Sequence, residues 1–470
     1  MTTPDQTDAI LDCAIIGGGV GGLATAWRLG QRRGLDGLAL FEAGSRWGGL
    51  VLTGTHDGFV VEQGPDAVLS AKPAGLILMK DLGLEDQVIS TRPEARKGLI
   101  AKGTRLLPLP EGFQLLAPAK FWPFLWSPVM SLPGKLRMAW DLFLPARDPA
   151  LPEESLAQFV RRRLGREALE RLAQPLIGSV HSADPERLSL LAAFPQLIQM
   201  ERNHRSLVLA MRASVRAHGT QGASGARYAL FITLKGGLQV LTDRLVERLA
   251  GAELRLNTAV QRLERSADGW RLHLADGSVR RARRVALCLP AHAAARLLAE
   301  AAPALSTELA AIPYAGICTV ALGCARSQLA RLPEAAGFVV PSIERRLTMA
   351  CTIASSKFAG RAPDDAVLLR AAVGGATGQQ HQQLDNAALV AGVLADLRDL
   401  VGLSGTPRFI EVTRWPASLP QYELGHLQRV ARIRAIEAAM PDLALIGNGY
   451  EGTGIPDVVG QGAVLAQRWA

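Results

Sequence analysis

The sequence predicts an α/β protein of more than one domain, and three observations at its N-terminal end support this fold class. The apolar run DCAII ends at Ile16 and is typical of a short buried strand. A glycine-rich stretch over 17–22, a helical pattern over 23–33 and a second apolar strand over 38–41 follow. This order of elements predicts a β-α-β unit in which a tight glycine turn joins the first strand to the helix.

The glycine turn carries the pattern of a dinucleotide-binding loop. Gly17, Gly19 and Gly22 stand in the stretch GGGVGG, and Glu42 ends the second strand twenty residues after Gly22. Glycines at these positions let the backbone turn sharply and approach a pyrophosphate at the helix N-terminus. A carboxylate at this distance accepts hydrogen bonds from both ribose hydroxyls and repels a 2′-phosphate, so NADP is disfavoured.

Composition limits the other classes of function. Among 470 residues, 48% are hydrophobic and 20% are charged, which suits a globular protein with a sizeable core. The net charge of +9 is carried almost entirely by arginine, since the chain has only eight lysines. The basic residues are dispersed, and their densest run, over 280–284, has no aromatic residues between the charges, so nucleic acid is not expected as a partner.

Cysteine usage and the longest apolar run bear on localisation. The five cysteines form no C-x-x-C pair and have no ligand-like spacing to histidine, so neither a metal site nor a disulfide framework is expected. The first twelve residues are polar and acidic, unlike a signal peptide, and the uncharged run over 309–325 is too short to span a bilayer. We therefore expect a cytoplasmic protein.

Two further glycine motifs distinguish the kind of dinucleotide. Glu42 is followed by Arg46, Gly48 and Gly49 in EAGSRWGG, and then by Gly64 and Pro65 in EQGP. With this run the sequence resembles the flavin amine oxidase superfamily, in which the arginine and the paired glycines lie along the FAD pyrophosphate and the later loop approaches the flavin. The resemblance implies FAD as the cofactor.

The C-terminal stretch IGNGYEGTGIPDVVGQG predicts a second loop and helix at the same cofactor. Its glycines, from Gly447 to Gly454, follow a strand, and Pro456 stands where a helix would begin, a position that the fixed φ of proline favours. Such a helix N-terminus carries unpaired N–H groups and partial positive charge. Directed at the carbonyl edge of a flavin, it would stabilise the negative charge that develops there on reduction.

Four longer stretches narrow the resemblance. They are LKGGLQVLTDRL (234–245), LSLLAAFPQLIQMERNHRSL (188–207), RWPASLPQYELGH (414–426) and GNGYEGTGIPDVVGQG (447–462). In these stretches and in their order the chain is similar to the protoporphyrinogen oxidase family, oxygen-dependent flavoenzymes of haem synthesis. The resemblance implies noncovalent FAD with these contacts: Gly17, Gly19, Gly22, Glu42, Arg46, Gly48, Gly49, Gly64, Pro65, Val260, Trp415, Gly447, Ile455 and Val458.

The resemblance also implies the division of the chain. We expect a glutathione reductase-like FAD-binding fold assembled from residues 1–97, 226–305 and 416–470. A mixed α+β substrate domain would occupy 306–415. A helical insertion over 98–205 would associate with a membrane and admit the substrate.

The segment over 113–145 is the basis for the membrane expectation. It holds Phe121, Trp122, Phe124, Trp126 and Trp140 and has basic residues at its margins, namely Lys120, Lys135 and Arg137. Core packing explains such a composition as readily as a peripheral membrane contact with rings at the headgroup level. The family places a membrane-associating region here.

The resemblance implies that the flavin itself accepts the hydride and that no side chain is catalytic. Lys72, in VLSAKPAG, matches a basic position near the porphyrinogen carboxylates, although a solvated loop lysine fits equally. His204 suits a surface or core histidine better than a general base. Protoporphyrinogen IX is the first expected substrate and coproporphyrinogen III the second, with dioxygen as acceptor and hydrogen peroxide as by-product. A flavin amine oxidase is the alternative activity, and a homodimer is one option for assembly.

Overall fold

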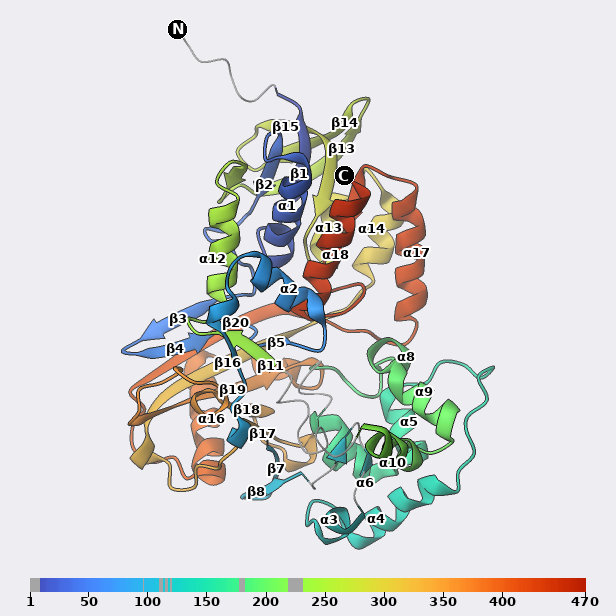
Figure 1. Cartoon of the computed structure of the whole chain (residues 1–470), viewed down its shortest axis with the longest axis vertical. Helices are drawn as coiled ribbons and strands as arrows, with labels where there is room; N and C mark the ends of the chain where they lie inside the picture. Colours follow the sequence, from blue (N-terminus) through green and yellow to red (C-terminus); the bar gives the residue numbers. More distant parts are fainter. Residues whose placement is uncertain are drawn as a thin grey trace.

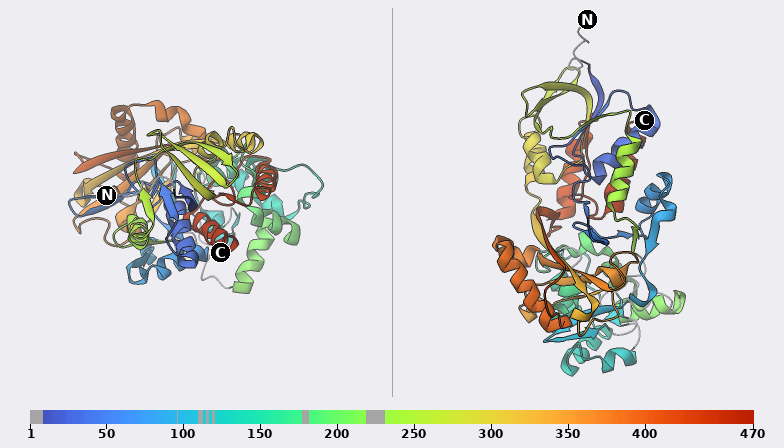
Figure 2. Two further views of the ribbon diagram at one scale, coloured as in Figure 1. Left: turned by 90° about the horizontal axis from the view of Figure 1, so that it is seen from above. Right: turned by 90° about the vertical axis from the view of Figure 1, so that its left-hand side faces the viewer.

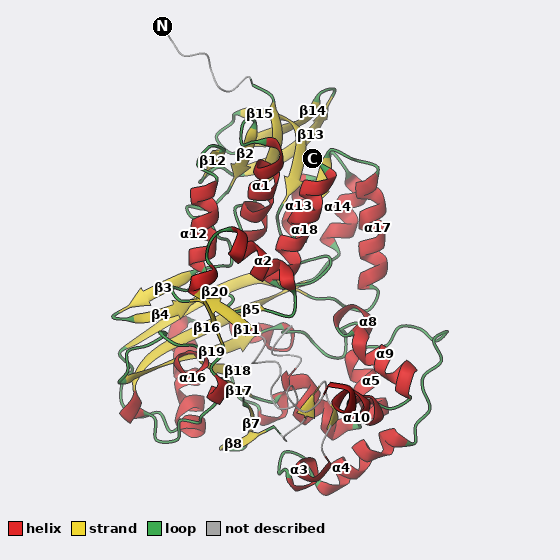
Figure 3. Cartoon of the chain, viewed as in Figure 1, coloured by secondary structure: helices red, strands yellow, loops and turns green. Residues whose placement is uncertain are grey.

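A computed structural model describes residues 9–95, 97–109, 113–114, 117–118, 121–176, 182–218 and 231–470 of the chain. Its elongated body has two halves, which are seen from three directions in Figures 1 and 2. The first half holds a seven-stranded sheet covered by helices on both faces. The second half combines another seven-stranded sheet with a cluster of helices beside it. Figure 3 shows this separation of strands from helices in the second half.

The first sheet is built around the predicted β-α-β unit. Its strand order is β12-β2-β1-β15-β14-β13, and β21 pairs with β15 outside this path. The strands are β1 (Leu11–Ile16), β2 (Leu38–Phe41), β12 (Glu253–Arg255), β13 (Val260–Ser266), β14 (Gly269–Leu274), β15 (Val279–Leu287) and β21 (Leu443–Leu445). β1 runs parallel to both β2 and β15, so segments from three distant parts of the chain form the centre of the sheet.

Side chains of β1 alternate between two hydrophobic cores, one on each face of the sheet. Cys13 and Ile15 join the core beneath α1 (Val20–Arg33), α12 (Gln239–Arg248) and α18 (Ile455–Arg468). Ala14 and Ile16 join the opposite core. That second core is covered by α13 (Ala291–Leu297), α14 (Pro303–Ala310) and α17 (His426–Ala438). The continuous apolar run that predicted this strand reflects burial on both of its faces.

The second sheet has the strand order β20-β16-β19-β18-β17-β7-β8. Its strands are β7 (Gly98–Lys102), β8 (Arg105–Pro108), β16 (Tyr314–Ala325), β17 (Gly337–Val339), β18 (Ala350–Ile353), β19 (Ala366–Gly374) and β20 (Phe409–Pro420). The helix α16 (Asn386–Val401) packs on one face, and the short α15 (Ala354–Lys357) follows β18. The expectation of a helical region from residue 98 onward is wrong at its start, because β7 pairs with β17 and brings β8 into this sheet.

Helices dominate the chain between β8 and β11 (Phe231–Leu234). They are α3 (Phe121–Trp126), α4 (Leu132–Ala139), α5 (Leu156–Arg163), α6 (Arg166–Ala168), α8 (Leu190–Ala193), α9 (Pro195–His204) and α10 (Leu207–His218). The sequence over 190–211 has a helical pattern, which the structure interrupts twice. Pro195 starts a new helix after α8, and Arg205 adopts a left-handed φ of 63° after α9.

A buried group of charged and polar side chains, here called the Arg163 cluster, holds the chain after α4 against α5 and α10. Neither Arg163 nor Asp141 is exposed to solvent, and Arg163 Nε donates to Asp141 Oδ1 at 2.6 Å. The other carboxylate oxygen accepts from Ser206 Oγ at 2.6 Å and from the Val208 N–H at 3.2 Å. Arg163 also donates to the carbonyls of Pro145 and Arg205.

The Arg163 cluster supports an exposed group of apolar side chains that we call the apolar ledge. The exposed fractions are 80% for Trp126, 60% for Leu132, 64% for Leu136, 57% for Trp140 and 70% for Phe143. α3 and α4, which carry part of it, lie at the end of the molecule far from the first sheet (Figure 1). No helix within the described ranges is long and apolar enough to cross a bilayer.

The aromatic residues of the predicted membrane segment differ in their exposure to solvent. Phe124 is only 6% exposed and belongs to the core of the helical region, so the core interpretation holds for this ring. Lys135 donates to the Leu125 carbonyl, and Arg137 donates to carbonyls at the end of α5. Lys120 and the side chains of Phe121 and Trp122 lie outside the described residues. So does the stretch over 219–225, whose glycine, serine and alanine residues predict a connector.

Short elements join the two halves. The strands β3 (Thr53–His56) and β4 (Phe59–Glu62) form a hairpin, and β11 lies between β5 (Val68–Leu69) and β6 (Val88–Ser90). The helix α2 (Pro73–Asp81) packs against α18. A further two-stranded ribbon joins β9 (Phe113–Gln114) and β10 (Ala117–Pro118).

Candidate functional site

The glycine turn after β1 has the tight geometry that its sequence predicts. Gly17 has a φ of 109°, and a Cβ there would lie 2.3 Å from the Cys288 carbonyl oxygen. A Cβ at Gly22 would lie 1.9 Å from the Gly17 carbonyl oxygen. Gly19 begins α1 as its N-cap without any side chain capping it. The first turn of α1 therefore keeps N–H groups for an anionic ligand that can approach closely.

The second glycine pair lies directly beside this turn. Gly48 forms a parallel bridge with Gly19, and its N–H donates to the Gly18 carbonyl at 2.8 Å. Arg46 donates to the carbonyls of Val51 at 3.1 Å and Trp47 at 3.2 Å, and also to that of Gly49. The guanidinium thus fixes the loop that carries the glycine pair. The structure brings together the two glycine motifs and Arg46, as the sequence predicted.

Glu42 follows β2 and points back at the glycine turn. Its Oε2 accepts from the Gly18 N–H at 2.6 Å, and its Oε1 accepts from the Gly44 N–H at 2.7 Å. The Glu42 carbonyl accepts from the Thr258 N–H at 2.8 Å, which places the start of β13, at Val260, close by. The carboxylate thus lies where the neighbouring strands β1, β2 and β12 end. Its role as a ribose ligand stays a prediction.

The EQGP loop packs onto the Arg46 loop from the other side. A Cβ at Gly64 would lie 1.8 Å from the Leu50 carbonyl oxygen, so only glycine fits. Trp415 Nε1 donates to the Gln63 carbonyl at 2.8 Å, and the guanidinium carbon of Arg46 lies 6.0 Å from the centre of the Trp415 ring. Three residues predicted separately, Arg46, Gly64 and Trp415, thus meet at the junction of the two halves.

The C-terminal loop and helix close the same site. Val458, in the first turns of α18, lies 2.5 Å from the position of a Cβ at Gly21 in α1. Ile455 is the first residue of α18, and a Cβ at Gly447 would lie 2.9 Å from the Leu289 carbonyl oxygen. The N-termini of α1 and α18 therefore lie beside each other, as expected if both serve one dinucleotide.

Lys72 has a partner that its sequence motif did not reveal. It precedes α2, and its ammonium group lies 2.6 and 2.8 Å from the two carboxylate oxygens of Asp457 in the first turn of α18. Asp457 also accepts from the Gly454 N–H at 3.1 Å. The Lys72 side chain is 49% exposed, so a substrate carboxylate could reach it in competition with Asp457. The substrate role of Lys72 stays a prediction.

Two features of the site region were missed by the motifs. The Tyr422 hydroxyl donates to the Asn448 carbonyl at 2.7 Å and accepts from the Gly452 N–H at 2.9 Å, so it holds the C-terminal glycine loop. Its ring stacks on His426, with centroids 3.9 Å apart. Its place in the matched stretch LPQYELGH was the available signal. His204, in contrast, is exposed at the end of α9 and does not join the site.

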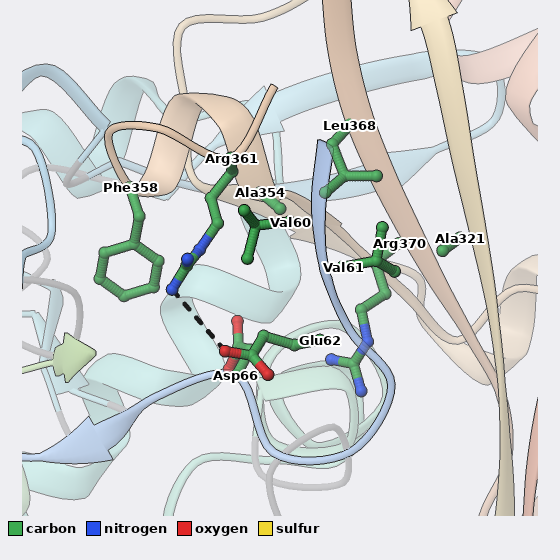
Figure 4. Close-up of a pocket in the computed structure, with 10 residues that line it drawn as sticks. All are labelled: Val60, Val61, Glu62, Asp66, Ala321, Ala354, Phe358, Arg361, Leu368 and Arg370. Carbon is green, nitrogen blue, oxygen red and sulfur yellow. Dashed lines mark ion pairs between the residues drawn. The ribbon is translucent and has the colours of Figure 1, made fainter. Parts of the chain in front are cut away.

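The second missed feature is a group of five charged side chains under the EQGP loop. We call it the Arg370 cluster; it consists of Glu62, Asp66, Lys357, Arg361 and Arg370. In Figure 4 the two carboxylates lie between the guanidinium groups of Arg361 and Arg370. Lys357 pairs with Asp66 at 2.7 Å, and Arg361 lies 3.7 Å from Glu62. One arginine within the buried strand AVLLRAAVG was the sequence signal for this cluster.

Burial and charge act in opposite directions on the two carboxylates of the Arg370 cluster. Burial raises the pKa of Glu62 above its ordinary value, although Thr53 and the Leu238 N–H both donate to the carboxylate at 2.7 Å. Burial also opposes the ionisation of Asp66, but Lys357 and Arg370 outweigh it and hold the pKa of Asp66 below its ordinary value. The cluster therefore keeps Asp66 ionised.

The arrangement fits a flavin dinucleotide. Two glycine loops whose backbones exclude any Cβ meet two helix N-termini, and a carboxylate stands at the far end of the turn. Such a cradle can hold the pyrophosphate between the loops and a ribose near Glu42. A flavin ring would extend toward the junction that holds Gly64 and Trp415.

The chain is similar to known proteins along almost its whole length. A family model described as flavin containing amine oxidoreductase matches residues 20–468. A coproporphyrinogen III oxidase from Propionibacterium freudenreichii subsp. freudenreichii is 37% identical over 97% of this chain and 90% of its own length. A chloroplastic protoporphyrinogen oxidase from Nicotiana tabacum is 29% identical, covering 94% of this chain and 81% of the relative.

A solved structure has the same architecture. The crystal structure of a protein from Exiguobacterium sp. 255-15, provisionally named protoporphyrinogen oxidase, superposes with a TM-score of 0.86 at 28% identity. The match covers 98% of both chains. Both halves of the molecule and their junction are therefore shared with that structure.

Proposed function

The chain belongs to the family of flavin containing amine oxidoreductases and takes a flavin as its cofactor, and we propose that it oxidises a porphyrinogen, with coproporphyrinogen III as the first choice. The observation that carries this choice is the 37% identity to a coproporphyrinogen III oxidase, against 29% to a protoporphyrinogen oxidase. This reverses the order expected from the sequence, in which protoporphyrinogen IX came first. An amine substrate is the alternative, since the family is named for it.

In the proposed reaction, the chain's own residues bind and orient the two reactants. Gly17, Gly22 and Gly49 would let the backbone approach the pyrophosphate of noncovalent FAD, and Glu42 would hold the ribose. FAD held there would supply the hydride acceptor, with dioxygen as the proposed final acceptor and hydrogen peroxide as its product. Three hydrides would leave from meso carbons, with two protons from nitrogen and one from the remaining meso carbon, and no side chain is assigned as the general acid or base.

The junction between the halves would present the substrate to the flavin. Trp415 and Gly64 lie there, where the second sheet meets the first half of the molecule, here called the nucleotide half because it holds the glycine loops. Lys72 stands at the edge of this region, before α2, and could pair with a propionate. A substrate with more propionates benefits more from an arginine-rich surface, which agrees with the choice of coproporphyrinogen III.

An anaerobic titration tests the proposal. Coproporphyrinogen III, protoporphyrinogen IX and a set of primary amines are each added to the purified protein, and bleaching of the flavin band is followed. Rapid bleaching by coproporphyrinogen III, slower bleaching by protoporphyrinogen IX and none by amines is the expected order. Bleaching by amines alone would replace the proposal with amine oxidation, and a preference for protoporphyrinogen IX would restore the original order.

We also propose that the apolar ledge touches a membrane surface. Its five side chains are all more than half exposed, and the Arg163 cluster fixes the backbone beneath them. Lys135 and Arg137 are engaged with backbone carbonyls, so the ledge would bind chiefly through apolar contact. An exposed apolar group of this kind is typical of a surface that meets a membrane or another apolar partner.

Sedimentation with lipid vesicles tests this contact. The variant Trp126→Ser, Leu136→Ser, Trp140→Ser should bind vesicles about tenfold more weakly than the parent while keeping its flavin. Phe124 is left intact because it is buried. Ile77→Ser, Val464→Ser is the matched control, since both residues are exposed but lie elsewhere. Equal binding by parent and ledge variant, on neutral and anionic vesicles alike, would overturn the proposal.

A further inference from the structure

The peptide between Gln63 and Gly64 is bonded to the second half of the molecule through its carbonyl oxygen. Its carbonyl accepts from Trp415 Nε1 at 2.8 Å, from Thr319 Oγ1 at 3.2 Å and from Arg370 at 3.5 Å. These donors come from β20, β16 and β19, three neighbouring strands of the second sheet. Arg370 also donates to the next carbonyl, that of Gly64.

The other side of this peptide is free. None of the described residues forms a cis peptide bond, so the Gly64 N–H points away from the Gln63 carbonyl and from the strands that hold it. Among the described residues this N–H has no hydrogen-bond partner. Gly64 lies against Leu50, next to the loop that carries the glycine pair of the nucleotide site. The unpaired N–H is therefore available to a ligand in that site.

Arg370 also leaves positive charge behind the peptide. The Arg370 cluster contains three cations and two carboxylates, and the carboxylates are paired with Lys357 and Arg361. Within the described part of the chain, Arg370 has no ion-pair partner, and its buried Nε has no hydrogen-bond partner. It lines a cavity of about 10 Å³ with room for about one water molecule. Water there would not neutralise the charge.

We propose that Arg370 is a positioning residue for the flavin, which orients the Gln63–Gly64 peptide and polarises it so that the Gly64 N–H donates to the flavin ring. Cations and hydrogen bonds at the carbonyl of a peptide make its N–H a stronger donor. A stronger donor favours the reduced flavin, which carries more negative charge than the oxidised form. Arg370 thereby raises the midpoint potential of the flavin.

This role rests on the flavin cofactor and not on the identity of the substrate. The midpoint potential is measured by equilibration with reference dyes without any porphyrinogen, so failure of the substrate proposal leaves the test intact. Arg370→Met should lower the affinity ratio for reduced over oxidised flavin about tenfold, which is about 30 mV for a two-electron couple. Arg370→Lys keeps the charge and should recover most of this loss.

Arg346→Met is the matched control. Arg346 lies in the same half, donates to the Gly103 carbonyl at 3.0 Å and pairs with Asp396, away from the EQGP loop. Its potential should equal that of the parent. A potential for Arg370→Met that matches the Arg346→Met control would overturn the proposal. So would an Arg370→Lys potential as low as that of Arg370→Met, because the charge would then have no effect.

Thr319→Val keeps the test decisive if Arg370→Met does not fold. It removes one neutral donor from the Gln63 carbonyl and leaves the charges untouched. The affinity ratio should fall about threefold, a smaller step in the same direction. An unchanged potential in Thr319→Val would contradict polarisation of the peptide, since this variant removes a donor from the Gln63 carbonyl.

Discussion

The Arg163 and Arg370 clusters are both groups of charged side chains in the protein interior, but only one of them is fully satisfied. In the Arg163 cluster, each nitrogen of the guanidinium donates to a carboxylate or carbonyl, and both oxygens of Asp141 accept. In the Arg370 cluster, one guanidinium nitrogen has no partner among the residues that the structure describes, and the cations outnumber the carboxylates. A closed network serves the scaffold, whereas surplus charge beside a ligand site serves the ligand.

Breaking the Arg163 cluster should have the largest effect, which is a loss of unfolding free energy. Arg163→Met leaves Asp141 buried without its cation, which costs about 3–5 kcal/mol of unfolding free energy. Urea unfolding of the apoprotein measures the loss. The double variant Arg163→Met, Asp141→Asn should recover part of it, since no buried charge then remains. A loss below about 1 kcal/mol would show that the two clusters differ less than their geometry indicates.

Glu42 gives the next largest effect, on cofactor affinity and not on stability. Glu42→Ala should weaken FAD binding about a hundredfold or more, because the two proposed charge-assisted hydrogen bonds to the ribose would contribute roughly 1.5–3 kcal/mol each. Fluorescence titration of the apoprotein with FAD measures the change. Glu42→Gln keeps the shape of the side chain, so its affinity for FAD should lie between that of Glu42→Ala and that of the parent. Full flavin occupancy after dialysis of Glu42→Ala would rule out the ribose role.

Lys72 offers a partly exposed ion pair against which both buried clusters can be judged. Lys72→Met should raise KM several-fold at nearly constant kcat, corresponding to about 1 kcal/mol, and the effect should shrink at high salt. Asp457→Asn frees the ammonium group from its present partner and should lower KM. Steady-state kinetics at two ionic strengths measure both. A collapse of kcat in Lys72→Met would mean that Lys72 positions the reacting carbon.

The smallest effect concerns the pH dependence of stability that arises from the Arg370 cluster. Because burial raises the pKa of Glu62, its contribution to stability is present at acid pH and is lost as pH rises through the folded-state pKa. Asp66 has a lowered pKa and acts in the opposite direction, losing its contribution as pH falls. Glu62→Gln should therefore gain stability over the parent as pH rises from about 4 toward neutrality. Parallel unfolding profiles for the two proteins would contradict this assignment.

The nucleotide half could be predicted closely from sequence because its signals are local. The strand over 38–41 was predicted to the residue, and α1 within a few residues, since glycine turns and apolar runs mark their ends. Strands from 11–41, 253–287 and 443–445 lie in one sheet, whereas the predicted domain boundaries stay a prediction. Here the resemblance added what local patterns lack, namely which distant strands belong together.

The second half was harder because its determinants are distant in sequence. β7 reads as an isolated apolar stretch, and only pairing with Phe338 and its neighbours places it in a sheet. Phe124 and Trp126 are equally apolar, yet one is buried and the other is exposed, which depends on the helices packed around them. The Arg370 cluster assembles from three stretches, at 62–66, 357–361 and 370, so no single motif predicts it.

The insertion of β21 beside β15 has a consequence for the order in which the protein matures during translation. β1 leaves the ribosome early, but the sheet and the α1 face are completed only when β21 and α18 have been synthesised. The contacts among α3 to α10 are local by comparison, so the helical region can fold before the first sheet is complete. Flavin uptake is therefore a late event in biogenesis, and a chain stalled before residue 443 would accumulate with a folded helical region and an open nucleotide cradle.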